Sequence, residues 1–479
     1  MDRDITGTPH RVTATSIHGQ RSTSDHSTKR PEAESSDELC NPDVESGSQK
    51  VNLNAKSQID LPISYEDKRK LLRYGKFFTL LLIFKSTVGI CYFNYHYAIA
   101  KCGFLLAMFL NVITCYLTTY GLYKITRLAD LIEKKAEEEE GTETMIRVYH
   151  ELPEIMKISG AQYLKYIILC ACVMMTGGSN IGNLSMVSTM MASNLGVNLY
   201  IVKLVICIFF CALMLFIVEP EKIKGILLIV TVTLIVMVIM VITHSVYMIV
   251  DPSANKVLDP RGVHLTYANW VNMGLFLGVS SYAFESIGSI FNVRRTMKDR
   301  TAMPGLQIWA FIFIAISYYV TGLCVYLAYG DYGMKPTVFM YYSWAGQPVM
   351  YCLSFIYAAT CVFNIPFNVI AFVENFEILP CLKNTLSDRN GELSRWKLTI
   401  FRILVVVVSM AITLVTDNVA TILGICGSLA APLISYILPM VLWWQFVPTG
   451  KWWKLHDCTV IGLGLVCAGF GLYSSLTYK

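Results

Sequence analysis

The stretch that decides the fold is Phe77–Phe104, which reads FFTLLLIFKSTVGICYFNYHYAIAKCGF. It is apolar and long enough to cross a bilayer as a helix, which takes about 20 residues. Lys85 and Gly89 nevertheless lie near its middle. A charge at the bilayer centre costs at least about 2.5 kcal/mol, so a plain anchor would carry Leu or Val there. We therefore predict a span that is broken near Ser86–Gly89, with its freed peptide groups facing a polar cavity.

A second polar interruption lies five spans downstream, in WVNMGLFLGVSSYAFESIGSIFNV, residues Trp270–Val293. Its small and polar residues are Gly278, Ser280, Ser281, Glu285, Ser286 and Gly288. Two broken spans five apart fit two five-helix repeats of inverted topology, each of which begins with a discontinuous helix. Such helices expose amide groups for a carboxylate and carbonyl groups for an ammonium, so an α-amino acid fits between them.

The composition agrees with a membrane protein. Of the 479 residues, 54% are hydrophobic and only 15% are charged, against an average of roughly 25% charged. The apolar runs predict about eleven spans, at about residues 77–104, 104–123, 166–194, 200–218, 226–250, 270–293, 306–329, 346–372, 398–415, 419–446 and 460–476. The basic residues behind the net charge of +5 lie in short loops between these runs. They indicate membrane topology, and no nucleic-acid partner is expected.

The predicted domain organisation is a polar tail followed by a membrane domain. Residues 1–65 carry too few apolar side chains to fold and are expected to form a disordered cytosolic tail. The membrane domain covers residues 66–479, with repeat one at about 77–250, repeat two at about 268–446 and an additional span at about 460–476. The basic loops fall on the same side as the tail, which places the N-terminus in the cytosol.

Four motifs along the chain carry a family resemblance. They are Phe84-Lys85-Ser86-Thr87-Val88-Gly89 with Tyr95-His96-Tyr97-Ala98, then Tyr282-Ala283-Phe284-Glu285-Ser286-Ile287-Gly288, then Ala328-Tyr329-Gly330-Asp331, and last Gly424, Gly427 and Ser428 with Ile437-Leu438-Pro439. With these motifs in this order, nearly all of the membrane part resembles the amino acid/auxin permease family, especially its proton-coupled amino acid transporter branch.

The resemblance implies an all-α, LeuT-like 5+5 inverted repeat and secondary active transport of amino acids by alternating access, proton-coupled or uncoupled. The alternative is an amino acid-sensing receptor that signals without net flux. The residues expected to bind the amino acid are Ser86, Thr87, Val88, Gly89, Tyr282, Phe284 and Ser286. The chain departs from the family pattern at Thr87, Cys91 and His96, where the family has Asn, Gly and Pro. Loss of the Asn amide makes sodium less favoured than the proton as the coupling ion.

Three ionisable residues in the broken spans are candidates for coupling. Lys85 and Glu285 form a buried ion pair, or, as the alternative, Glu285 accepts a proton during transport. His96 is either a hydrogen-bonded packing residue or part of the proton coupling. The chain contains no G-x-x-x-x-G-K-[ST], G-x-S-x-G or H-E-x-x-H motif. We therefore expect no enzymatic activity, cofactor or metal. The expected location is a multi-pass position in the plasma membrane or in a vacuole- or lysosome-like endomembrane.

Overall fold

The structure is a computed structural model. It describes residues 74–140, 162–216, 224–251, 265–331, 334–342, 348–377, 385–387, 394–415 and 418–477. The predicted tail, residues 1–65, lies outside the described residues. An isolated bridge pairs Tyr74 with Met297.

The membrane domain is built from helices. The spans in chain order are α2 (Lys76–Thr87) with η1 (Ile90–Asn94) and α3 (Tyr95–Cys102), α4 (Phe104–Glu140), α6 (Gln162–Leu195), α7 (Leu199–Phe216), α8 (Lys224–Val250), α10 (Met273–Phe284) with α11 (Ile287–Thr296), α12 (Met303–Tyr329), α13 (Pro348–Glu377), α15 (Arg395–Val415), α16 (Val419–Ala431) with η5 (Pro432–Ile437) and α17 (Leu438–Phe446), and α18 (Lys451–Thr477). Among the described residues, 10 helices are long and apolar enough to cross a membrane, and one bent pair makes up to 11 spans. This confirms the predicted number.

Span one breaks where the sequence predicts. Helix α2 ends at Thr87 and η1 begins at Ile90, and the two halves of the span are bent by 55°. The Ser86 and Thr87 hydroxyls each donate to the carbonyl oxygen of Ile83, at 2.9 Å. Such bonds to the preceding turn compete with the helical pattern and favour a bend.

Span six breaks over a shorter stretch than the sequence predicts. Only Glu285 and Ser286 leave the helix, because α10 continues through Phe284. The prediction that Gly278, Ser280 and Ser281 interrupt the span is wrong. Gly278 serves helix packing instead, since a Cβ there would lie 2.5 Å from the Gly424 carbonyl oxygen of α16.

The two broken spans run antiparallel to each other and are bonded at both ends. At the end where the chain enters α2, Lys298 N donates to Tyr74 O at 3.0 Å. At the opposite end, Asn269 N donates to Cys102 O at 2.6 Å. We call the first end the inner side, which is the predicted cytosolic side, and the second the outer side.

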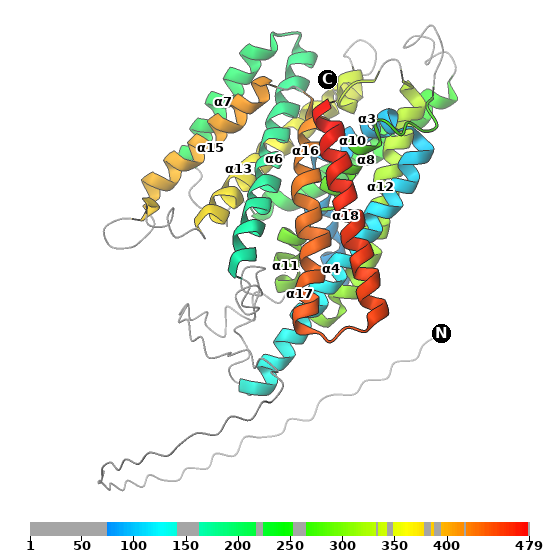
Figure 1. Cartoon of the computed structure of the whole chain (residues 1–479). Helices are drawn as coiled ribbons and strands as arrows, with labels where there is room; N and C mark the ends of the chain where they lie inside the picture. The colour runs from blue at the N-terminus through cyan, green and yellow to red at the C-terminus, as the bar shows by residue number, and fades with distance from the viewer. Residues whose placement is uncertain are drawn as a thin grey trace, which may run out of the picture. The chain divides into compact units, whose positions relative to one another are not determined.

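Helices that occupy equivalent places in the two repeats pack against each other. Span one packs on span six through α2 with α11 and α3 with α10, and α4 packs on α12, α6 on α13 and α7 on α15. Figure 1 shows α6, α7, α13 and α15 gathered at one flank, where their side chains form a separate apolar cluster. Four of the five equivalent pairs of spans are thus in contact, which fits two repeats of inverted topology.

Two helices are longer than predicted, and polar residues in their inner halves bond to each other. Helix α4 runs to Glu140, and α18 already begins at Lys451. Asp457 is fully buried and accepts from Lys124 Nζ at 2.6 Å through both carboxylate oxygens. The last span is therefore joined to span two by a buried ion pair that the sequence interpretation missed.

Candidate functional site

The breaks of spans one and six lie side by side. Helix α2 packs on α11, and η1 packs on α10. Tyr318 of α12 lies between them, with ring centroids 4.8 Å from Tyr92 and 5.9 Å from Phe284. Its hydroxyl donates to the Thr87 carbonyl oxygen at 3.5 Å, where the helix has ended. The sequence interpretation missed Tyr318; the adjacent Tyr318–Tyr319 pair in the middle of a span was the available signal.

The space at the breaks is open on one side. Ser86, Gly89 and Gly288 are exposed, and a Cβ added at either glycine would meet no atom within 4 Å. By contrast, residues 90–100, on the outer side of the first break, are all buried. The accessible surface at the breaks therefore belongs to their inner halves, α2 and α11.

The predicted substrate-binding residues of span one differ in their surroundings. Ser86 is exposed, but its hydroxyl is bonded to its own helix, as is that of the buried Thr87. Val88 is buried and extended, with φ −82° and ψ 106°. Gly89 follows with the open space beside it. The first break therefore offers a ligand mainly backbone peptide groups and few polar side-chain atoms.

The predicted substrate-binding residues of span six are mostly engaged in packing. The Tyr282 hydroxyl donates to the Met175 carbonyl oxygen of α6 at 3.1 Å. Phe284 is fully buried against Tyr318. Ser286 is 2% exposed, and its Oγ has no hydrogen-bond partner among the described residues. Of these three, Ser286 alone has a polar atom left for a ligand.

Glu285 and Lys85 do not form the ion pair that one sequence interpretation expected. Instead, Glu285 Oε1 accepts from the backbone N–H of Ile287 at 2.9 Å, in the first turn of α11. Within the described residues, no nitrogen–oxygen distance between Lys85 and Glu285 falls below 4.0 Å. A carboxylate at a helix N-terminus is stabilised by the free amides and by the helix dipole, so it needs no lysine.

His96 is bonded on the outer side of the break. Its Nε2 lies 3.1 Å from the Lys335 carbonyl oxygen, and its ring packs edge-on against Tyr341. Tyr341 in turn accepts from Lys335 N at 2.7 Å and stacks on Tyr329 at 3.9 Å. Burial also lowers the pKa of the Lys335 ammonium group in this loop. These contacts are the ones expected if His96 is a hydrogen-bonded packing residue. They also hold residues 334–342 over the outer half of span one.

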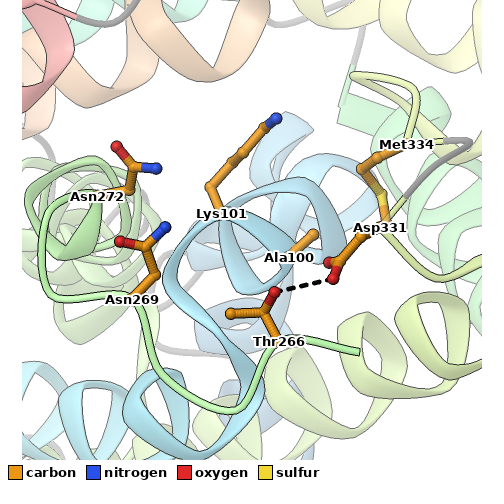
Figure 2. A pocket seen from close by; sticks show the side chains of 7 residues that line it. All are labelled: Ala100, Lys101, Thr266, Asn269, Asn272, Asp331 and Met334. Carbon is orange, nitrogen blue, oxygen red and sulfur yellow. Dashed lines mark hydrogen bonds between the residues drawn. The ribbon is translucent and has the colours of Figure 1, made fainter. Parts of the chain in front are cut away.

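A polar cavity of about 330 Å³ lies at the outer end of span one (Figure 2). It is lined by Ala100, Lys101, Thr266, Asn269, Asn272, Asp331 and Met334. Asp331 is held by the Thr266 hydroxyl at 2.8 Å and the Tyr326 hydroxyl at 2.7 Å. Because both carboxylate oxygens are bonded, Asp331 ties the loop before span six to the end of span seven. The cavity does not include the breaks.

Comparison with known families decides what kind of protein this is. The family model described as "Transmembrane amino acid transporter protein" matches residues 77–477. The chain belongs to this family. The resemblance to the amino acid/auxin permeases is thereby confirmed, and the transmembrane amino acid transporter family is one of multi-pass membrane transporters.

Two curated relatives match part of the chain at low sequence identity. The chain is 25% identical over 206 residues to "Amino acid transporter ANT1" of Arabidopsis thaliana, covering 42% of this chain and 48% of that protein. It is 23% identical over 262 residues to "Vacuolar amino acid transporter 3" of Saccharomyces cerevisiae, covering 53% of this chain and 36% of the relative. The matched regions span less than half the length of these two relatives.

The fold has a solved counterpart. A manganese transporter of Eremococcus coleocola superposes with a TM-score of 0.52 at 11% identity, over 88% of this chain and 90% of that one. At this identity the similarity concerns the fold alone. It confirms the predicted LeuT-like architecture, and the breaks of the first and sixth spans are seen in this chain's own helices.

Proposed function

We propose that this protein is a secondary active transporter that carries amino acids across a membrane by alternating access around the two breaks. The observation that carries the proposal is the pair of broken spans whose breaks lie side by side next to open space. Membership of the transmembrane amino acid transporter family supports it. So do the names of the two relatives, which describe amino acid transporters.

The chemistry of the breaks fits a zwitterion. Helix α11 presents its N-terminus at Ser286 and Ile287, where the terminal amides and the dipole favour a carboxylate. Helix α2 ends at Thr87, where terminal carbonyl groups favour an ammonium group. The two charged groups of an α-amino acid would thus be held by peptide groups. The proposed binding residues are Ser86, Thr87, Val88, Gly89, Tyr282, Phe284 and Ser286.

We propose the proton as the coupling ion, with Glu285 as its carrier. Glu285 is a carboxylic acid at the break, and its carboxylate has a backbone partner and no cation within ion-pair distance among the described residues. The Asn of the family pattern is Thr87 here, which disfavours sodium. A vacuole- or lysosome-like membrane, with an acidic lumen, would supply the proton gradient, and the yeast relative is named as vacuolar.

Reconstitution in proteoliposomes tests the proposal. Uptake of each radiolabelled amino acid would be measured with and without a pH gradient, in the presence and absence of sodium. We expect saturable uptake of at least one amino acid, stimulated by the pH gradient and unaffected by sodium removal. No saturable uptake under any condition, together with thermal stabilisation by an amino acid, would favour the receptor alternative instead.

A further inference from the structure

The N-terminus of α11 is already occupied in this structure by a carboxylate of the same chain. Glu285 lies in the break with φ −66° and ψ 127°, and its Oε1 is 2.9 Å from the Ile287 amide nitrogen. Helix α11 has 10 residues, so its terminal amides carry the partial positive charge of a full helix. A substrate carboxylate would use the same amides, and two carboxylates cannot share one donor without repulsion.

A second group marks the same place as a ligand position. Ser286 is the N-cap residue of α11, yet its side chain makes no capping hydrogen bond. Its Oγ is buried and has no partner among the described residues. A buried hydroxyl without a partner is destabilising, so a ligand oxygen placed there would relieve that cost. The hydroxyl and the Ile287 amide belong to successive residues at the same helix end.

The charged and titratable groups around Glu285 leave its carboxylate uncompensated. Cys172 of α6 and Tyr282 of α10 lie within electrostatic reach of it, and neither is a cation. Lys85 of α2 is half-buried without an ion-pair contact to it. Arg294, at the far end of α11, is bonded to Asp130 at 2.6 Å. The negative charge of Glu285 is therefore balanced mainly by the helix end that the substrate would need.

We propose that the Glu285 carboxylate stands in for the substrate's α-carboxylate at the N-terminus of α11, and that a proton taken up by Glu285 vacates this position for the substrate. The proposal rests on the proposed function and specifies how its proton and its substrate are linked. A hydronium ion in the open space beside Gly89 and Gly288 gives up one proton and becomes water, and this proton forms an O–H bond on the Glu285 carboxyl group. The neutral acid then releases the Ile287 amide, which donates to the incoming carboxylate.

Because the Glu285 carboxylate and the substrate carboxylate compete for one position, the affinity for amino acids should depend on pH. Above the titration range of Glu285, the fraction of protein with a vacated position falls tenfold for each unit of pH. The apparent affinity for amino acids should fall by about the same factor. Ligands without an α-carboxylate do not compete for the position, so their affinity should not follow this slope.

The experiment is a ligand-induced shift of the melting temperature, measured on the full chain in detergent from pH 5 to pH 8. The probe is an equimolar mixture of the twenty L-amino acids, and the counter-probe is the matching mixture of L-amino acid amides. Wild type should need about tenfold more amino acid per pH unit above the titration range. Glu285→Gln should bind amino acids independently of pH, with the affinity that wild type shows at low pH. Asp299→Asn, the same chemical change at an exposed carboxylate, should behave as wild type.

The outcomes separate this inference from the proposed function. A Glu285→Gln protein that keeps the wild-type pH slope would overturn the inference, as would a wild type that takes up amino acids with a pH-independent affinity. If no amino acid raises the melting temperature of any variant or is taken up by any variant, at any pH, the proposed function fails. Should Glu285→Gln not fold, Glu285→Asp replaces it. That fallback keeps a carboxylate able to accept from the amide two residues on, so Glu285→Ala is measured beside it. The alanine variant has no side-chain acceptor for the Ile287 amide, and a wild-type slope in Glu285→Ala would equally overturn the inference.

Discussion

At the residue scale, the polar side chains of both breaks bond to their own chain and not across to the other span. Ser86 and Thr87 bond back to Ile83, and Glu285 bonds forward to Ile287. The contact across the breaks is supplied by Tyr318, whose hydroxyl is directed to the Thr87 carbonyl oxygen. A substrate that uses the Thr87 carbonyl or the Ile287 amide must therefore replace these internal partners.

Tyr318→Phe tests that contact. The ring packing between Tyr92 and Phe284 is kept, and one hydrogen bond of 3.5 Å is lost. We expect the free energy of unfolding to change by less than about 1 kcal/mol, because a neutral hydrogen bond contributes about that much. Because the Thr87 carbonyl loses a competing donor, amino acid uptake should show a KM lowered several-fold, with only a small change in melting temperature. Tyr319→Phe, which removes a bond to the Phe104 carbonyl oxygen away from the breaks, is the control and should leave KM unchanged.

The position of the first break was predictable from residue type, whereas the partners of the site residues were not. A lysine, a glycine and hydroxyl groups in an apolar run indicate a break by their cost in lipid alone. The partner of Glu285 is a backbone amide, which leaves no mark in the sequence. The ion pair with Lys85 was the natural inference, and the structure does not contain it. Tyr318 looks like any aromatic residue of a buried span until its neighbours are known.

At the element scale, the glycines of span six and span ten form one helix contact. A Cβ at Gly427 would lie 2.1 Å from the Gly278 carbonyl oxygen and 2.7 Å from the Tyr282 Cβ. The Gly424–Gly427 part of the family motif thus keeps α16 against α10, the half-helix that ends in the break. Sequence spacing alone could suggest small-residue packing, yet it suggested a longer break in span six instead.

Gly427→Ala should therefore destabilise the transporter domain. The methyl group would overlap backbone atoms that cannot turn away, and overpacking of this kind costs about 1–3 kcal/mol. We expect a lower melting temperature in detergent and reduced uptake, since the end of α10 would move. Gly462→Ala on α18 is the matched control, because a Cβ there meets no atom within 4 Å. An unchanged melting temperature for Gly427→Ala would contradict the close contact.

At the scale of the whole molecule, the additional span is part of the same packed unit as the two repeats. Asp457 of α18 accepts from Lys124 of α4, from the Tyr120 hydroxyl at 2.7 Å and from Trp444 Nε1 at 2.7 Å. The span count was predictable because about 20 apolar residues are needed for each crossing. The pairing of Lys124 with Asp457 was not, since they are 333 residues apart in the chain.

Removing the charge of Lys124 alone should lower the melting temperature more than removing the charges of both Lys124 and Asp457. Lys124→Met leaves a buried carboxylate without its cation, a change that costs roughly 3–5 kcal/mol. Lys124→Met combined with Asp457→Asn leaves no buried charge, and the amide oxygen can still accept from Tyr120 or Trp444. We expect the double variant to recover much of the melting temperature lost by the single one. Equal melting temperatures for the two variants would mean that the ion pair does not hold α18.

Access to the breaks is also a property of the whole molecule, because it depends on which ends of the spans are closed. The loop of residues 334–342 covers the outer half of span one, while Ser86, Gly89 and Gly288 are exposed on the inner half. A cysteine in place of Ser86 should therefore react with a membrane-impermeant thiol reagent from the inner side only. Replacing the exposed Cys170, Cys352 and Cys458 by Ser, together with Cys40 and Cys381, which lie outside the described residues, gives the background for this measurement.

A matched cysteine at the fully buried Ala98, in the outer half-helix, should stay unlabelled from both sides. Amino acid at a saturating concentration should slow labelling of Ser86→Cys, because the ligand fills the space beside Gly89. If the substituted cysteine reacts only from the outer side, the opening lies at the other end of the spans. If the amino acid has no effect on the rate, the space beside the first break is not where the substrate binds, and the role proposed for both half-helices fails with it.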